Sequence, residues 1–253
     1  MKHFIIPDTQ CKPNHDLSYL ADIGQYIVDK QPEVVVHLGD HADMESLSSY
    51  DVGTKQFEGK RYLKDVEAAQ EGMVALLTPL WEYNKKQQKN GKKQYKPRMV
   101  LTLGNHENRI HRAVNLDPKL EGVLSVDALG YVGFGWEVYP FLEVVVIDGV
   151  AYSHYFVTGV AGRPASSAAA LLRKTNMSCV AGHQQGKQIA YATRADGKTL
   201  TAIIAGSCYE HNEDYLGPQG NKHWRGALML HEVNEGSFDE MWLSLNYLKN
   251  RKK

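Results

Sequence analysis

The chain has 253 residues, of which 43% are hydrophobic, the ordinary proportion for a globular protein with one sizeable core. Its 29 lysines and arginines balance its 29 aspartates and glutamates, so no global charge attracts nucleic acid or a membrane surface. The three cysteines are too sparse for a disulfide framework and fit a reducing, cytoplasmic compartment. The first carboxylate, Asp8, comes too early for a signal peptide, and no apolar run reaches the length of a membrane span.

The first forty residues predict a β-α-β unit. Residues 4–7 form a short apolar run, and residues 16–30 carry apolar side chains at helical spacing. A proline then ends the helix, and the β-branched run at residues 34–38 predicts a strand that is buried on both faces. Asp8 and Asp40 come directly after the two predicted strands.

The next ninety residues predict helices on either side of a third strand. Residues 61–90 read as mostly helical, and Pro79 is expected to kink or interrupt this helix. A lysine-rich stretch at residues 85–98 leads into a strand at residues 99–103. Residues 108–130 are predicted to be helical.

The remaining residues predict hairpins around one alanine-rich helix. The turn Asp148-Gly149 joins two short strands. The alanine-rich helix covers about residues 165–174, and a strand follows at residues 177–181. The last quarter predicts antiparallel strands with turns at residues 195–198 and 234–237.

Five polar clusters each follow a strand-like run and contain residue types that bind metal ions. In chain order they hold Asp8 and Gln10; Asp40, His41 and Asp43; Asn105, His106 and Glu107; His154; and His183 and Gln185. Because an α/β fold gathers strand ends at one edge of its sheet, such clusters can converge on a single site. Carboxylates, amides and imidazoles together can hold two divalent cations, with one carboxylate bridging them. Glycines before three of the clusters allow sharp turns and close approach of a ligand.

The order of these clusters resembles the calcineurin-like metallophosphoesterases. The most specific motifs are Gly39-Asp40-His41-Ala42-Asp43 and Gly104-Asn105-His106-Glu107, and the resemblance extends from Asp8 to Gln185. It implies a four-layer α/β/β/α sandwich of two mixed sheets. Residues 1–253 would form a single domain, with a helical and basic insertion at about 44–98.

The resemblance also implies a centre of two divalent metal ions. Asp40 corresponds to the carboxylate that bridges both ions, and Asp8 corresponds to a ligand of the first ion. Asn105, His154 and His183 correspond to the remaining ligands of the second ion, for which Mn²⁺, Fe²⁺ and Zn²⁺ are the candidates.

Two departures from the family affect the first ion only. Gln10 and Gln185 stand where the family usually has histidines, and both of those histidines serve that ion. One interpretation is an all-oxygen first site made of Asp8, Gln10, Asp40 and Gln185, whose hard donors favour Mn²⁺ or Mg²⁺ over Zn²⁺. In the other interpretation, the first ion is weakly held or absent and the protein works with one metal. We favour the all-oxygen site because both replacements keep a side chain that can coordinate.

His106 resembles the family's non-ligand histidine, which acts near the leaving-group oxygen as general acid or transition-state stabiliser. Asp43 and Glu107 are predicted to orient the histidines of the site. Arg109 and His41 are candidate substrate contacts, with a solvated helix face and a loop position as the simpler interpretations.

The resemblance implies metal-dependent phosphoester hydrolysis by direct attack of a metal-bound water or hydroxide. The lysine-rich stretch favours a phosphodiesterase acting on nucleotides or nucleic acid, although a solvated loop is its simpler interpretation. Two alternatives stay open: a small-molecule phosphomonoesterase, and a catalytically weakened scaffold that binds proteins. The retained His106 argues against the scaffold, which needs no catalytic acid. The expected partner is a phosphoester, no membrane is expected, and the sequence leaves the oligomeric state open.

Overall fold

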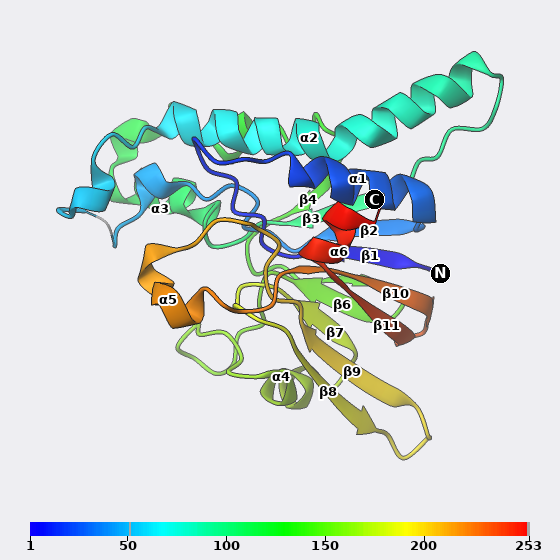
Figure 1. Cartoon of the computed structure of the whole chain (residues 1–253). Coiled ribbons are helices and arrows are strands. Elements are labelled where there is room, and N and C mark those ends of the chain that lie inside the picture. Colours follow the sequence, from blue (N-terminus) through cyan, green and yellow to red (C-terminus); the bar gives the residue numbers. More distant parts are fainter. Residues whose placement is uncertain (51, 252–253) are drawn as a thin grey trace.

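The computed structural model describes residues 1–50 and 52–251 of the chain. Asp51, which falls within the predicted insertion, and Lys252 and Lys253 lie outside the described residues. Two mixed β-sheets stack on each other and helices cover their outer faces, so the architecture is the predicted α/β sandwich (Figure 1).

The first sheet brings the carboxyl ends of four parallel strands to the same side of the molecule. Its strand order is β11-β10-β1-β2-β3-β4, in which β1 to β4 are parallel and β10 is antiparallel to both β1 and β11. The strands are β1 (His3–Ile6), β2 (Val34–His37), β3 (Arg98–Thr102), β4 (Glu137–Tyr139), β10 (Gly226–Asn234) and β11 (Ser237–Ser244). Because β1 and β2 are buried on both faces, their sequences are almost continuously apolar rather than alternating.

The second sheet adds two further strand ends to the same side of the molecule. Its order is β5-β6-β7-β9-β8, with β6, β7 and β9 parallel and with antiparallel strands at both edges. The strands are β5 (Val145–Ile147), β6 (Val150–Ser153), β7 (Cys179–Ala181), β8 (Gln188–Thr193) and β9 (Thr199–Ile204). His154 directly follows β6, and His183 follows β7 by two residues.

Three hydrophobic cores separate four layers. The first sheet packs against α1 (Tyr19–Lys30), α2 (Tyr62–Lys89) and α6 (Leu245–Asn250), and the second packs against α4 (Ala168–Thr175) (Figure 1). Neighbouring residues of β9 show the alternation: Ile203 points into the core between the sheets, and Ile204 points toward α4. Burying each such side chain stabilises the fold by about 1.5–3 kcal/mol before the entropy of ordering is subtracted. The four-layer α/β/β/α arrangement is therefore confirmed.

The predicted helices are present, with changed ends. α2 continues through Pro79, and its ribbon changes direction along its length (Figure 1). The helix predicted over residues 108–130 is wrong beyond Leu116, because α3 (Asn108–Leu116) stops before Pro118. Asp117 is extended, with a φ of −134°, as expected for the residue before a proline.

Short elements complete the chain. α6 was not predicted; the Ser244 side chain caps it by accepting the N–H of Tyr247, and Leu245 and Leu248 bury its inner face. The remaining short elements are α5 (Gly217–Gly220) and the 3₁₀ turns at Glu45–Leu47, Lys55–Phe57, Pro118–Leu120, Val126–Leu129 and Asp214–Leu216. Within the described residues, no helix combines the length and the apolar character that crossing a membrane requires.

Candidate metal centre

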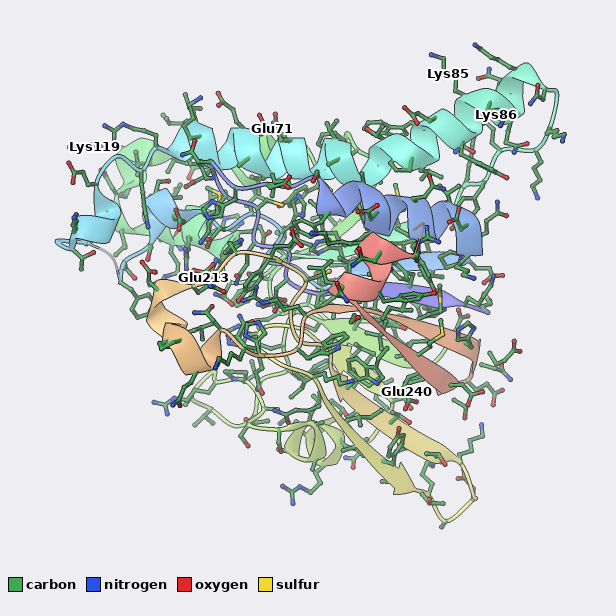
Figure 2. All side chains as sticks on the ribbon, in the orientation of Figure 1. Glu71, Lys85, Lys86, Lys119, Glu213 and Glu240 are labelled. Carbon is green, nitrogen blue, oxygen red and sulfur yellow. The ribbon has the colours of Figure 1, made fainter. Side chains whose placement is uncertain are left out.

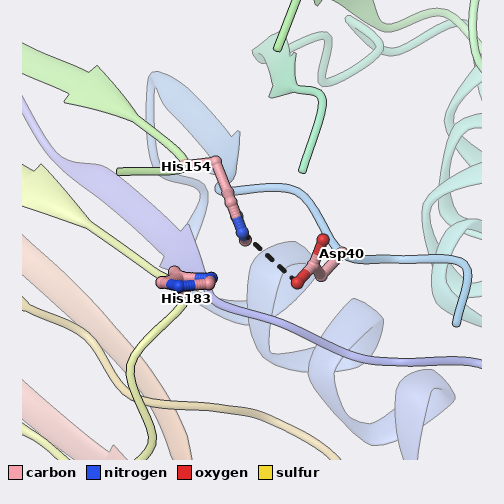
Figure 3. A group of neighbouring side chains, drawn as sticks. All are labelled: Asp40, His154 and His183. Atoms are coloured by element: carbon pink, nitrogen blue, oxygen red, sulfur yellow. Dashed lines mark ion pairs between the residues drawn. The ribbon is translucent and has the colours of Figure 1, made fainter. Parts of the chain in front are cut away.

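Four donor atoms from four strand-end loops converge on one point. Asn105 Oδ1 lies 2.9 Å from His154 Nε2 and 2.7 Å from His183 Nδ1. Asp40 Oδ2 lies 3.3 Å from the same His154 nitrogen. Figure 3 shows Asp40, His154 and His183 approaching one another from separate loops. The structure thus brings together the four residues predicted to hold the second ion.

The hydrogen bonds of His154 show why a cation fits between these atoms. Its Nδ1–H donates to the backbone oxygen of Leu38 at 2.8 Å, so Nε2 of the neutral ring carries a lone pair. That lone pair faces oxygens of Asp40 and Asn105, which are also acceptors. Converging acceptors repel one another unless a positive charge lies among them. The two nitrogens and two oxygens suit Mn²⁺, Fe²⁺ or Zn²⁺.

The charges around these donor atoms favour a positive charge among them. Burial opposes charging of His154, but the neighbouring Asp40 carboxylate outweighs it and raises the pKa of the ring to about 9. Burial, with a smaller contribution from the charge on His154, lowers the pKa of His183 to about 4, so His183 is neutral at pH 7. Burial alone would raise the pKa of Asp40, yet His106 and His154 bring it below its usual range. Asp40 is therefore an anion whose charge attracts a proton or a metal ion.

Unpaired oxygens of Asp8 and Gln10 mark the position predicted for the first ion. Asp8 Oδ1 accepts the backbone N–H of His183 at 3.1 Å. Asp8 Oδ2 and Gln10 Oε1 are buried, and among the described residues neither has a hydrogen-bond partner. A buried acceptor without a partner destabilises the fold. Both oxygens are therefore suited to be ligands of a cation. Burial raises the pKa of Asp8 to about 7.

Gln185, the fourth residue of the proposed oxygen site, has a protein partner. Its Oε1 accepts the hydroxyl of Tyr209 at 3.0 Å, and an amide oxygen has a second lone pair to offer. Whether one ion gathers all four predicted oxygens stays a prediction.

Three of the predicted ligands have backbones in the left-handed region. The φ angles are 41° at Gln10, 48° at Asp40 and 66° at His183. This conformation costs roughly 1–2 kcal/mol for a residue other than glycine, and such strain clusters at functional sites. The strained backbone at these strand ends therefore lowers the stability of the fold but fixes the direction of these side chains.

Two glycines make room for the carboxylates. A Cβ on Gly104 would lie 2.0 Å from Asp40 Oδ1, and a Cβ on Gly182 would lie 2.6 Å from Asp8 Oδ1. Both distances are far below contact, so the glycines that precede Asn105 and His183 are required for close approach of these carboxylates.

Glu107 organises the backbone of the site. Its buried carboxylate accepts the Tyr131 hydroxyl at 3.1 Å and four backbone N–H groups, those of Asp40 (3.0 Å), His41 (2.7 Å), Ala42 (3.0 Å) and Gly104 (2.9 Å). It was predicted to orient a histidine side chain; its contacts instead tie the loop after β2 to the loop after β3.

His106 and Asp43 form a hydrogen-bonded pair beside Asp40. His106 Nδ1 lies 2.7 Å from Asp43 Oδ1, and His106 Nε2 lies 3.7 Å from Asp40 Oδ2. Burial opposes charging of His106, but the Asp40 and Asp43 carboxylates leave its pKa raised. Burial works against ionisation of Asp43 as well, and the bond to His106 lowers the pKa of Asp43 to about 2. Arg109 adds a third contact, with its Nη2 3.3 Å from His106 Nε2.

His41 lies behind the site rather than at its surface. It is buried, and its Nε2–H donates to the backbone oxygen of Ala69 at 2.9 Å, so Nδ1 accepts the Thr9 hydroxyl at 2.7 Å. His37 Nδ1 accepts the backbone N–H of Gly39, so the ring proton of His37 is on Nε2. This Nε2–H donates to the Thr9 hydroxyl oxygen at 3.1 Å. The ring of His41 is fully buried and therefore leaves no exposed surface for the predicted substrate contact.

The lysine-rich stretch lies far from the candidate centre. It forms the end of α2 and the segment leading into the start of β3, whereas Asn105 follows the end of β3. Figure 2 shows Lys85 and Lys86 at the opposite end of the molecule from Glu213, which lies near the site. The feature that favoured a nucleic-acid polymer as substrate is therefore separated from the donor atoms by the length of the sheet.

Two residues beside the site were not singled out by the sequence. The ring of Tyr155 is partly exposed and lies 4.8 Å from the ring of His183. Lys12 is buried, and its Nζ lies 3.6 Å from Asp43 Oδ2. Tyr155 could have been noticed as the neighbour of His154, but no local pattern marks Lys12.

Known proteins offer a structural similarity but no match to a family. No protein-family model matches the chain, and no curated protein matches it. Among solved structures, the chain is similar to YfcE, a phosphoesterase from E. coli, with 12% sequence identity and a TM-score of 0.37. The alignment covers 97% of this chain and 100% of that one. At this TM-score the similarity carries no weight, and the fold and site rest on the topology and contacts described above.

Proposed function

We propose that the protein hydrolyses phosphoesters with the help of divalent metal ions and that residues 1–253 act as one catalytic domain. The observation that carries the proposal is the convergence of Asp40, Asn105, His154 and His183 beside His106. Metal-ligating atoms next to a histidine with a raised pKa form a combination that can support phosphoester cleavage.

The residues of the chain have separate tasks in this proposal. Bound divalent cations would neutralise the non-bridging oxygens of the ester and activate a water nucleophile. The Nδ1–H of His106 is held by Asp43, and the raised pKa of the ring favours a second proton on Nε2, which can be given to the leaving oxygen. Arg109 lies 3.3 Å from that nitrogen and offers a guanidinium for a phosphoryl oxygen.

We propose nucleotide phosphodiesters as the substrate class. The partly exposed ring of Tyr155, beside His183, offers a flat surface on which a base can stack. A small nucleotide is preferred over a polymer because the lysine-rich stretch lies at the other end of the sheet. A small-molecule monoesterase is the competing activity, and the assay below distinguishes the two.

The test measures turnover of a bis-aryl and a mono-aryl phosphate with Mn²⁺, Mg²⁺ and Zn²⁺ in turn. Diester turnover should vanish in Asp40→Asn and fall by about 10²–10⁴-fold in His106→Ala, the usual contribution of a general acid. His231→Ala is the matched control, since His231 lies toward the far end of β10 and should leave turnover unchanged.

Each other outcome rejects part of the proposal. Turnover of the monoester alone would make the protein a phosphomonoesterase. No turnover with any metal, in a protein that still binds metal, would favour the weakened scaffold. Metal titration should find two ions, with the ion at Asp8 and Gln10 bound more weakly; a single ion even in millimolar Mn²⁺ would reject the all-oxygen site.

A further inference from the structure

A second group of metal-ligand residue types lies next to the proposed catalytic pair. Asp43, His211 and Glu213 have donor atoms spaced as metal ligands would be. However, Lys12 places its ammonium among them, with Nζ 2.9 Å from Glu213 Oε1 and 3.6 Å from Asp43 Oδ2. The positive charge of this group is therefore supplied by the chain, and the group is not a free metal site.

Lys12 connects three loops that come from distant parts of the sequence. It follows β1, whereas Asp43 and Glu45 follow β2, and Glu213 belongs to the segment between β9 and β10. Lys12 Nζ also lies 3.4 Å from Glu45 Oε1, so one ammonium forms ion pairs with three carboxylates. Lys12, Asp43 and Glu213 are all buried, so removing the ammonium would take away positive charge that two buried carboxylates share.

The backbone fixes Lys12 beside Asp43. The backbone N–H of Asp43 donates to the oxygen of Cys11 at 3.0 Å, and the N–H of Cys11 donates to the oxygen of His41 at 2.6 Å. The residue after Cys11 therefore has a defined place next to Asp43. Asp43 uses Oδ1 for His106 and turns Oδ2 toward Lys12.

We infer that Lys12 is a positioning residue for the leaving-group step, acting through Asp43 on His106. This inference rests on the proposed function, because it assigns Lys12 a part in that same reaction. Lys12 holds Oδ2 of Asp43, which leaves Oδ1 aimed at Nδ1 of His106 and keeps Nε2 directed into the site. Glu213 holds Lys12 from the other side, so the segment between β9 and β10 also contributes to the alignment of His106.

The test compares two leaving groups. Lys12→Met should lower kcat for bis-phenyl phosphate by about tenfold or more, but for bis(4-nitrophenyl) phosphate by less than about threefold, because the better leaving group needs less proton donation. KM should stay the same for both esters. Lys12→Arg should restore most of the loss, since it keeps the charge, and Glu213→Gln should reproduce the leaving-group dependence more weakly.

Controls separate positioning from loss of structure. Lys64→Met removes an exposed lysine paired with Glu67 at 2.6 Å and should change neither rate. Thermal melting of each variant shows whether it is folded. If Lys12→Met does not fold, the two leaving groups are compared in Lys12→Arg and Glu213→Gln instead. Equal loss on both esters, or no loss, would overturn the inference.

A second measurement does not depend on turnover. The ring proton on Nδ1 of His106, followed by NMR, should report the bond to Asp43 in the unaltered protein and should weaken or exchange faster in Lys12→Met. If the unaltered protein hydrolyses neither ester, the proposed function fails. The NMR signal of this proton then tests by itself whether Lys12 positions His106. An unchanged proton signal in a folded Lys12→Met variant would reject Lys12 as a positioning residue.

Discussion

Metal binding to the second site should release a proton from His154. The ring has a pKa of about 9 because the Asp40 carboxylate outweighs the effect of burial, and its Nδ1–H is already committed to Leu38. A metal ion requires the lone pair of Nε2, so the ion must displace the proton held there. Since the pKa is raised, the ring is charged below pH 9 and the competition grows as the pH falls.

The size of the effect follows from the pKa. Each pH unit below 9 should weaken the apparent metal affinity about tenfold, or about 1.4 kcal/mol, which makes binding at pH 7 about 100-fold weaker than above pH 9. Asp8, with a pKa of about 7, is mostly ionised at pH 8, where His154 is still mostly protonated. At pH 8 the release should therefore be about 0.9 proton per ion, and His154 is its source.

Calorimetry can count this proton. Zn²⁺ or Mn²⁺ is titrated at pH 8 in two buffers that differ in ionisation enthalpy, and the difference in observed heat gives the number of protons released. His154→Gln keeps an oxygen donor but removes the titrating ring, so it is the matched control and should release close to none. An affinity that stays constant between pH 7 and pH 9 in the unaltered protein, with no proton released, would refute the reasoning.

Three further predictions concern the residues that shape the site. In Glu107→Gln, an amide N–H₂ would face backbone N–H groups, so two donors would oppose each other. Urea denaturation should show a free energy of unfolding lower by about 3 kcal/mol. A loss below about 1 kcal/mol would contradict the organising role of Glu107. Gly104→Ala would put a Cβ 2.0 Å from Asp40 Oδ1, so metal titration should show loss of both ions even if circular dichroism shows a folded protein. Gln10→His should tighten the weaker ion and shift its preference from Mg²⁺ toward Zn²⁺, as measured by competition titration; an unchanged preference would place Gln10 outside the site.

Much of the fold could be read from local patterns. The apolar runs at residues 4–7 and 34–38, the turn at Asp148-Gly149 and the hairpins of the last quarter all appear in the structure. These patterns succeed because they depend on neighbouring residues. The helix predicted over residues 108–130 ends at Leu116, because Pro118 favours an extended backbone at Asp117.

The strand-end clusters predicted which residues would meet, since parallel strands deliver their ends to one edge. In the sequence, the resemblance to the calcineurin-like metallophosphoesterases implied that Asp40, Asn105, His154 and His183 serve one ion and that Gln10 and Gln185 stand where that family usually has histidines. Only the tertiary structure decided that Glu107 binds the backbone, that His41 is buried, and that the lysine-rich stretch lies at the other end of the sheet.

Lys12 shows the reason for this division. Its closest partner, Glu213, is 201 residues away in the sequence, and the value of the contact depends on burial that only the assembled fold provides. Local chemistry fixes strands, turns and the types of donor atom, because each depends on a few adjacent residues. Charge balance and side-chain orientation inside the site depend on loops that meet only after both sheets have packed, so they could be known only from the folded chain.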